Sequence, residues 1–199
     1  MSLPMVKSKR NNSIMYTNPQ IESSYQENDL GRTLYDLVIE SQPEIIVEFG
    51  CLYGYSTVAM ALALKHLGKG KLKCYDLFEQ YQYKHSTLEQ TKANLVKYGV
   101  EDYVEFHIMD YYDWLDNPED FDLLHLDISN TGHIIIDSYL KLKPQIENGS
   151  VMVFEGGSEE RDNVEWMRKY KGMPINMIQQ YTNYEILNPD FPSLSIIKR

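Results

Sequence analysis

The chain has 199 residues and a mass of 23.3 kDa, the usual size of one domain with a single core. Its 19 Lys and Arg against 29 Asp and Glu leave a formal net charge of −10, which argues against a protein that grips nucleic acid phosphates. No apolar run approaches the ~18 residues of a membrane span, and two cysteines make no disulfide framework. We therefore expect a cytoplasmic protein without a nucleic acid or membrane partner.

The first part of the chain is polar and shows no periodic pattern. It also lacks the apolar stretch of a signal peptide. Residues 1–26 are predicted to form an arm that either frays or folds over the domain, and 27–199 to form the domain itself. That domain begins with a helix over 29–41, where leucines recur at helical spacing until Pro43.

Apolar runs of strand length then alternate with helical stretches. The five runs are residues 44–50, 71–76, 103–110, 121–127 and 150–156. This alternation is typical of right-handed βαβ units and predicts an α/β fold with a doubly wound, mostly parallel sheet. The strand-like runs 183–188 and 193–198 have no helix between them. They predict a C-terminal antiparallel hairpin, which makes the sheet seven-stranded.

Several helices in this region have recognisable ends. Ser86 and Glu89 form a candidate capping box for the helix before the third strand. The next helix is predicted over 132–143, with the following proline ending it. Ser158 is predicted to cap a helix that has basic residues near its end, at 168–169.

An acid stands at or near the end of each of the five runs. Ligands of open α/β sheets bind beyond the carboxyl ends of the parallel strands. A single polar residue at such a place is commonly part of a surface loop. Five together indicate a functional edge, and they are Glu48, Asp76, Asp110, Asp127 and Glu155.

The segment EFGCLYGYS, residues 48–56, passes from a strand into a helix through two glycines. Gly50 and Gly54 permit a sharp turn and a close approach to a ligand, and the helix N-terminus offers free N–H groups. Asp76 ends the next strand, where a carboxylate can accept ribose hydroxyls. These features predict a nucleotide-type cofactor. The alternative is a glycine-rich turn that only joins strand to helix.

From about residue 44 to 199, the chain resembles the class I S-adenosylmethionine-dependent methyltransferases. EFGCLYGYS is similar to the E/DxGxxxGxS loop of that family, and LKPQIENGSVMVF, residues 142–154, resembles the stretch usually written LxPGG. The resemblance implies a Rossmann-like methyltransferase fold and S-adenosylmethionine as cofactor. The cofactor-binding residues that it implies are Glu48, Gly50, Cys51, Gly54, Ser56, Asp76, Phe78, Asp110, Tyr111 and Asp127.

The resemblance also implies which part of the cofactor these residues meet. The strand end and loop that hold Glu48 and Gly50 would bound the methionine pocket, with Gly54 and Ser56 at its amino-acid end. Asp76 would hold the ribose. The third strand would place an acid at the adenine amino group, with two aromatic ring neighbours: Asp110, with Phe78 and Tyr111.

Within this family, the small-molecule O-methyltransferases are similar in the fourth strand and the loop after it. The segment FDLLHLDISNTGH, residues 121–133, loosely fits their FDxxxIDGDHxY pattern. However, Ser129 and Asn130 interrupt the acid cluster, and Glu155-Gly156 replaces the pair with which metal-dependent members complete a divalent-ion site. These departures argue against metal dependence, although Asp127, Asn130 and Glu155 carry hard oxygens of the kind that Mg²⁺ and Ca²⁺ prefer.

Methyl transfer depends mainly on how the acceptor is positioned, because the cofactor already activates the methyl group. A hydroxyl acceptor benefits from a base, for which Asp127, His133 and Glu155 are the candidates. His133 can instead cap or pack a helix. His85 is expected to be a solvated loop residue, whereas His125 within a strand is expected to be buried.

Tyrosine is frequent, with 16 residues. Seven lie in or beside the loops at strand ends: Tyr53, Tyr55, Tyr75, Tyr81, Tyr83, Tyr111 and Tyr112. Their rings either stack on a sugar or aromatic acceptor, or pack the loops and a homodimer contact. Cys51 and Cys74 have no partner at CxxC spacing and are expected to be buried without a redox role.

The sequence as a whole predicts an S-adenosylmethionine-dependent methyltransferase with a small-molecule acceptor, a hydroxyl oxygen of a glycan or secondary metabolite. One alternative is an NAD(P)-dependent oxidoreductase, but its GxGxxG fingerprint differs from the spacing of Gly50 and Gly54. Another is a non-catalytic binding subunit with the same fold.

Overall fold

A computed structural model describes residues 16–199 except 84, 130 and 171, with the side chains of 166 and 170 also left out. Its centre is a seven-stranded sheet in the order β3-β2-β1-β4-β5-β7-β6. The strands are β1 (Ile45–Phe49), β2 (Lys71–Asp76), β3 (Val104–Ile108), β4 (Leu123–Leu126), β5 (Val151–Glu155), β6 (Glu185–Ile186) and β7 (Leu194–Ile197). The first five pair in parallel, and β7 runs antiparallel to both β5 and β6. The predicted mostly parallel sheet and its terminal hairpin are confirmed.

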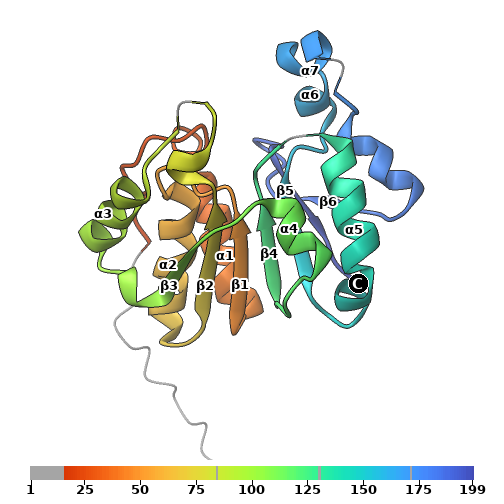
Figure 1. Cartoon of the computed structure of the whole chain (residues 1–199). Helices are drawn as coiled ribbons and strands as arrows, with labels where there is room; N and C mark the ends of the chain where they lie inside the picture. Colours follow the sequence, from red (N-terminus) through yellow and green to blue (C-terminus); the bar gives the residue numbers. More distant parts are fainter. Residues whose placement is uncertain (1–15, 84, 130, 171) are drawn as a thin grey trace, which may run out of the picture.

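Helices cover both faces of this sheet (Figure 1). One hydrophobic cluster packs α1 (Leu30–Ser41), α2 (Tyr55–Leu67) and α3 (Leu88–Tyr98) on the first face. A second cluster packs α4 (Tyr111–Asp116) and α5 (Gly132–Glu147) on the other. Among the described residues, no helix is both long and apolar enough to cross a membrane.

The remaining helices are short. At one end of the fold, α6 (Glu159–Asp162) and α7 (Glu165–Tyr170) stand out from the sheet (Figure 1). The 3-10 turns are η1 (Phe78–Gln80), η2 (Glu101–Tyr103) and η3 (Ile175–Gln180). The helix predicted from Ser158 onward is therefore two helices: Ser158 caps only α6, through a hydrogen bond from the Arg161 amide.

Two predicted helix ends were wrong. The capping box of α3 is formed by Thr87 and Gln90, because the Ser86 hydroxyl donates to the Leu52 carbonyl oxygen (2.5 Å) instead. The second error concerns α5, which does not stop before Pro144 but continues to Glu147. A proline so near a helix end removes only one amide donor, and the Pro144 carbonyl oxygen still accepts from the Asn148 amide (3.2 Å).

The described part of the predicted arm folds over the domain, on the side of α1, α2 and α3. Tyr16, Ile21 and Tyr25 are buried there. The Gln20 amide donates to the Tyr98 hydroxyl of α3 (2.6 Å), which ties the segment to the first helical layer. Residues 1–15 of the arm lie outside the described part of the chain.

Candidate active site

A cavity opens at the carboxyl ends of the parallel strands. Its walls come from the loops after β1 to β4 and from the first turns of α4 and α5. Five of the residues predicted to bind the cofactor line it: Gly50, Asp76, Asp110, Tyr111 and Asp127. The other lining residues are Phe49, Tyr75, Leu77, Tyr81, His85, Met109, Tyr112, Ile128 and Ile134.

Gly50 fixes the shape of this cavity where β1 ends. Its φ of +88° lies in the left-handed region, and a Cβ atom at this position would collide with the Asp127 carbonyl oxygen. Any larger residue would therefore push the loop after β1 away from the loop after β4. The glycine brings two acid-bearing strand ends onto one wall.

Asp76 lies at the centre of the same wall and is nearly buried. Its Oδ2 accepts from the amides of Cys51 (2.8 Å) and Leu52 (3.3 Å), and its Oδ1 accepts from the amide of Phe78 (3.0 Å). Leu52 and Phe78 both have a φ of +44°, which is unusual for residues other than glycine. Strained backbone at Leu52, after β1, and at Phe78, after β2, thus points amide groups at the Asp76 carboxylate.

His85 is not the solvated loop residue that the sequence predicts. It lines the cavity, and its Nε2 lies 3.1 Å from Asp76 Oδ1 and 3.2 Å from Oδ2. The side chain is 19% exposed. Nothing local in the sequence signals this contact, because the loop after η1 returns His85 to the end of β2 only in the folded chain.

Aromatic rings and a further acid also line the cavity. Asp110 caps α4 by accepting from the Tyr112 amide (2.9 Å), and it is exposed to the cavity. Of the seven tyrosines near strand ends, four line the cavity: Tyr75, Tyr81, Tyr111 and Tyr112. Tyr55 instead packs under the N-terminal segment, where its hydroxyl donates to Asn18 Oδ1 (2.7 Å).

Glu48 is completely buried beneath the loop after β1 and does not line the cavity. Its Oε1 accepts from the Ser56 hydroxyl (2.5 Å) and lies 3.1 Å from His125 Nδ1. Its Oε2 accepts from the Thr57 hydroxyl (2.6 Å) and the Cys74 thiol (3.1 Å). The carboxylate thereby ties β1 to β2, β4 and the first turn of α2. The other predicted cofactor-binding residues outside the cavity lining are Cys51, Gly54, Ser56 and Phe78.

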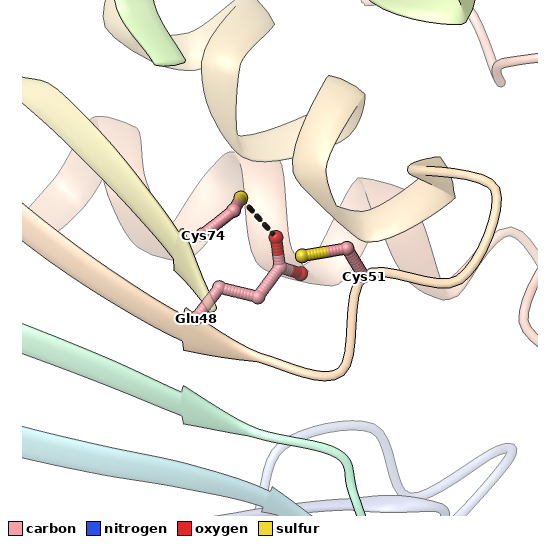
Figure 2. Close-up of side chains that lie close together, drawn as sticks. All are labelled: Glu48, Cys51 and Cys74. Atoms are coloured by element: carbon pink, nitrogen blue, oxygen red, sulfur yellow. Dashed lines mark hydrogen bonds between the residues drawn. The ribbon is translucent and has the colours of Figure 1, made fainter. Parts of the chain in front are cut away.

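Two cysteines lie beside this buried carboxylate (Figure 2). The ligand atoms of Glu48, Cys51 and Cys74 are all within 4.8 Å of one another, a proximity that the CxxC criterion misses. Burial raises the pKa of the Cys51 thiol to about 12 and the pKa of the Cys74 thiol well above its ordinary value. Because metal binding requires thiolates, this cluster is built as a hydrogen-bonded support and does not suit a cation.

Of the three predicted base candidates, only Asp127 lines the cavity. Burial, followed by the charge of neighbouring Glu155, raises the pKa of Asp127 well above its ordinary value. Glu155 is buried at the end of β5 and is paired with Arg161 Nη2. His133, at the start of α5, is exposed and does not line the cavity.

A mostly parallel sheet with one reversed strand, and acids that line a cavity at its strand ends, is typical of α/β proteins that bind nucleotide-type cofactors. A family model described as "Methyltransferase domain" matches residues 47–155, more than half of the chain. The protein therefore belongs to this methyltransferase family, and the predicted resemblance is confirmed. Among proteins with curated functions, none matches the chain.

Solved methyltransferases share this fold. TomG, an O-methyltransferase from Streptomyces achromogenes involved in tomaymycin synthesis and solved with SAM, is 18% identical; the match covers 89% of this chain and 81% of TomG, with a TM-score of 0.59. A methyltransferase from Geobacter sulfurreducens is 17% identical, with coverages of 88% and 78% and a TM-score of 0.59. An SAH-bound methyltransferase from Podospora anserina is 14% identical, with coverages of 89% and 79% and a TM-score of 0.61. None of these matches supports the NAD(P)-dependent alternative.

Proposed function

We propose that this protein transfers a methyl group from S-adenosylmethionine to a hydroxyl oxygen of a small molecule. The observation that carries the proposal is the cavity that gathers Gly50, Asp76, Asp110 and Asp127 at one edge of the sheet. Membership of the methyltransferase family supports the reaction class. The SAM and SAH in the complexes of two structural neighbours support the choice of cofactor.

The residues of the cavity fit such a cofactor. Asp76 offers a carboxylate for the ribose hydroxyls, and Gly50, which lines the cavity next to the Asp127 backbone, bounds the pocket for the methionine part. Asp110 and Tyr111 line the same cavity, and they are the residues that we propose for the adenine: an acid for the amino group and a ring for the base plane. Glu48 and Ser56 contribute from below, by holding the loop that carries Gly50.

When bound, S-adenosylmethionine supplies a methyl group on a sulfonium; its transfer to oxygen breaks the S–C bond, forms an O–C bond and releases the hydroxyl proton. Asp127 is the residue that accepts this proton, because it alone among the three candidates lines the cavity. Its raised pKa makes it a stronger base than an ordinary carboxylate once it is ionised. The other task of the chain is to hold the acceptor oxygen in line with the methyl group.

The acceptor that we propose is an aromatic hydroxyl compound of the secondary-metabolite type. Tyr81 and Tyr112 stand at the cavity with 43% and 49% of their surface exposed, so their rings can stack on a flat molecule. TomG, whose fold is shared, is involved in tomaymycin synthesis. A glycan could stack the apolar face of a sugar on the same tyrosine rings. Sugars therefore serve as the alternative acceptors with which aromatic hydroxyl compounds are compared in the assay.

Calorimetric titrations with S-adenosylhomocysteine and with NADH, run in parallel, test the cofactor. We expect binding of S-adenosylhomocysteine at one site per chain and no heat from NADH. If the folded protein binds no S-adenosylhomocysteine at millimolar concentration, the proposal fails. Incubation with radiolabelled S-adenosylmethionine and a panel of catechols, phenols and sugars then tests transfer; cofactor binding without methylation of any of them favours the non-catalytic subunit.

A further inference from the structure

Four side chains from distant parts of the chain meet where β4 and β5 end. Asp127 follows β4, Glu155 ends β5, Arg161 lies on α6 and Tyr25 belongs to the N-terminal segment. Glu155 and Tyr25 are 6% and 2% exposed. The Arg161 side chain is 28% exposed and Asp127 is half-buried at the cavity wall. The cluster is therefore a partly buried group of two carboxyls, one guanidinium and one phenol.

Arg161 is held in this cluster by its backbone and by its charge. The Ser158 hydroxyl accepts from the Arg161 amide (3.2 Å), and Arg161 Nη2 pairs with Glu155 Oε1. Two successive glycines, Gly156 and Gly157, have φ of +102° and +95° and turn the chain back so that α6 faces the end of β5. Arg161 Nε is buried and makes no hydrogen bond within the described residues, so the guanidinium is only partly satisfied.

Tyr25 is the fourth member of the cluster. Its side chain is buried, and the Asp127 side chain lies within hydrogen-bonding reach of its hydroxyl. Burial, followed by the charges of Asp127 and Glu155, raises the pKa of Tyr25 well above its ordinary value. The phenol therefore stays protonated beside the two acids and can hold Asp127 in place.

A divalent ion does not fit this arrangement. Such ions take several oxygen ligands, mostly carboxylates and carbonyls. The position after Glu155 is Gly156, whose φ is positive and which offers no side-chain ligand. Glu155 itself is already paired with a guanidinium, and Asn130 lies outside the described residues.

We propose that Arg161 is the resident cation of the acceptor site: it neutralises Glu155, leaves Asp127 facing the acceptor hydroxyl beside Tyr25, and makes the enzyme independent of divalent metals. The proposal rests on the proposed function for the nature of the acceptor. Arg161 is a positioning residue in this scheme, because it acts through Glu155. Its role predicts that removal of the guanidinium exposes an acid pair that can bind a metal ion.

Mn²⁺ is a direct probe of this role, because the electron paramagnetic resonance signal of the free ion falls when it binds. We expect no stoichiometric Mn²⁺ binding to the wild type, or to Arg161→Lys, which keeps the charge. Arg161→Met is expected to bind about one Mn²⁺ per chain, and the double variant Arg161→Met, Glu155→Gln to lose it again. Arg168→Met, which removes an exposed arginine of α7, is the matched control and should behave as wild type.

The measurement separates this proposal from the proposed function. Stoichiometric Mn²⁺ binding to the wild type, or none to an Arg161→Met protein that still binds S-adenosylhomocysteine, would overturn it. Both results are read without turnover, whereas the cofactor titration and the methyl-transfer assay judge the proposed function. Where methyl transfer is measured, the wild-type rate should be unchanged within twofold by EDTA, and loss of activity on chelation would contradict the role of Arg161.

Discussion

Two acids at neighbouring strand ends, Glu48 and Asp127, differ in what surrounds their carboxylates. Glu48 has Ser56, Thr57, Cys74 and His125 around its carboxylate, and every oxygen has two partners. Asp127 lines the cavity, and burial, followed by the charge of neighbouring Glu155, raises its pKa. A carboxylate whose partners all lie beneath the cavity stabilises the fold, whereas one with a perturbed pKa at the cavity wall can meet a ligand. Burial alone therefore does not identify the functional acid.

The largest effect that would sharpen this comparison is expected from Asp127→Asn. Loss of the base should lower kcat for methyl transfer by about 10²–10⁴-fold. The dissociation constant for S-adenosylhomocysteine should stay within about threefold, because the amide keeps the shape of the side chain. Steady-state kinetics and calorimetry measure the two quantities. Asp137→Asn, which changes an exposed acid of α5, is the control and should leave both unchanged; comparable losses in the two variants would contradict the assignment.

Glu48→Ala tests the other acid of the comparison, and its expected effect is a loss of stability. Four polar groups would lose their acceptor in a dry environment, so the free energy of unfolding should fall by about 3–5 kcal/mol. Urea denaturation followed by circular dichroism measures this change. Glu44→Ala, an exposed acid just before the same strand, should change stability by less than ~0.5 kcal/mol. If the free energy of unfolding of Glu48→Ala falls by less than ~1 kcal/mol, these hydrogen bonds do not stabilise the fold.

Asp76 lies between these two cases, since it accepts three amides and also lines the cavity. Asp76→Ala should weaken S-adenosylhomocysteine binding by at least about 10–100-fold, because the loss of even one ribose hydrogen bond to a charged group costs ~1.5–3 kcal/mol. Glu79→Ala on η1 serves as a nearby exposed control. An unchanged dissociation constant in a folded Asp76→Ala protein would refute the placement of the ribose.

The smallest effect expected is on the pH dependence of stability. Because the pKa of Asp127 is raised in the folded state, the folded protein holds this proton more tightly than the unfolded chain. That contribution is present below the unfolded pKa of about 3.9 and is lost as the pH rises through the folded pKa. At pH 8, Asp127→Asn should therefore melt at a higher temperature than wild type, because it avoids the free-energy cost of an ionised Asp127 in the folded protein. The melting temperature should rise by about 2–4 °C for each kcal/mol of this cost. The difference between the two proteins should shrink toward pH 4. A difference that does not depend on pH would contradict the raised pKa.

The sequence was sufficient to predict the sheet, because apolar runs and helical spacing are local signals that tertiary packing reinforces. It also placed Gly50, Asp76, Asp110 and Asp127 on one edge, since the carboxyl ends of parallel strands share an edge. The sequence-based predictions were wrong where one local pattern is compatible with two structures. Pro144 can end a helix or lie in its last turn, and Ser86 can cap a helix or bond to another loop.

The parts of the site that the sequence did not predict come from distant segments. His85 reaches Asp76 from a loop, Tyr25 comes from the N-terminal segment, and Arg161 comes from α6. No spacing rule connects these residues with the strand ends, because their proximity depends on how whole segments pack. Glu48 is the opposite case, because the sequence motif did reveal its position. Its burial and its contacts with Cys74 and His125 depend on how β2 and β4 pack beside β1, which the motif does not show.

The antiparallel strand β7 has a consequence for the order in which this protein matures during synthesis. It lies between β5 and β6, and Ser193 just before it contacts Glu155 Oε1 with its hydroxyl (3.4 Å). The residues that line the cavity, from Phe49 to Ile134, leave the ribosome before β7, whereas the contact between Ser193 and Glu155 needs the last strand. Non-local contacts of this kind are slow to form. A nascent chain therefore holds every wall of the cavity before it holds the strand that contacts the carboxylate at the end of β5.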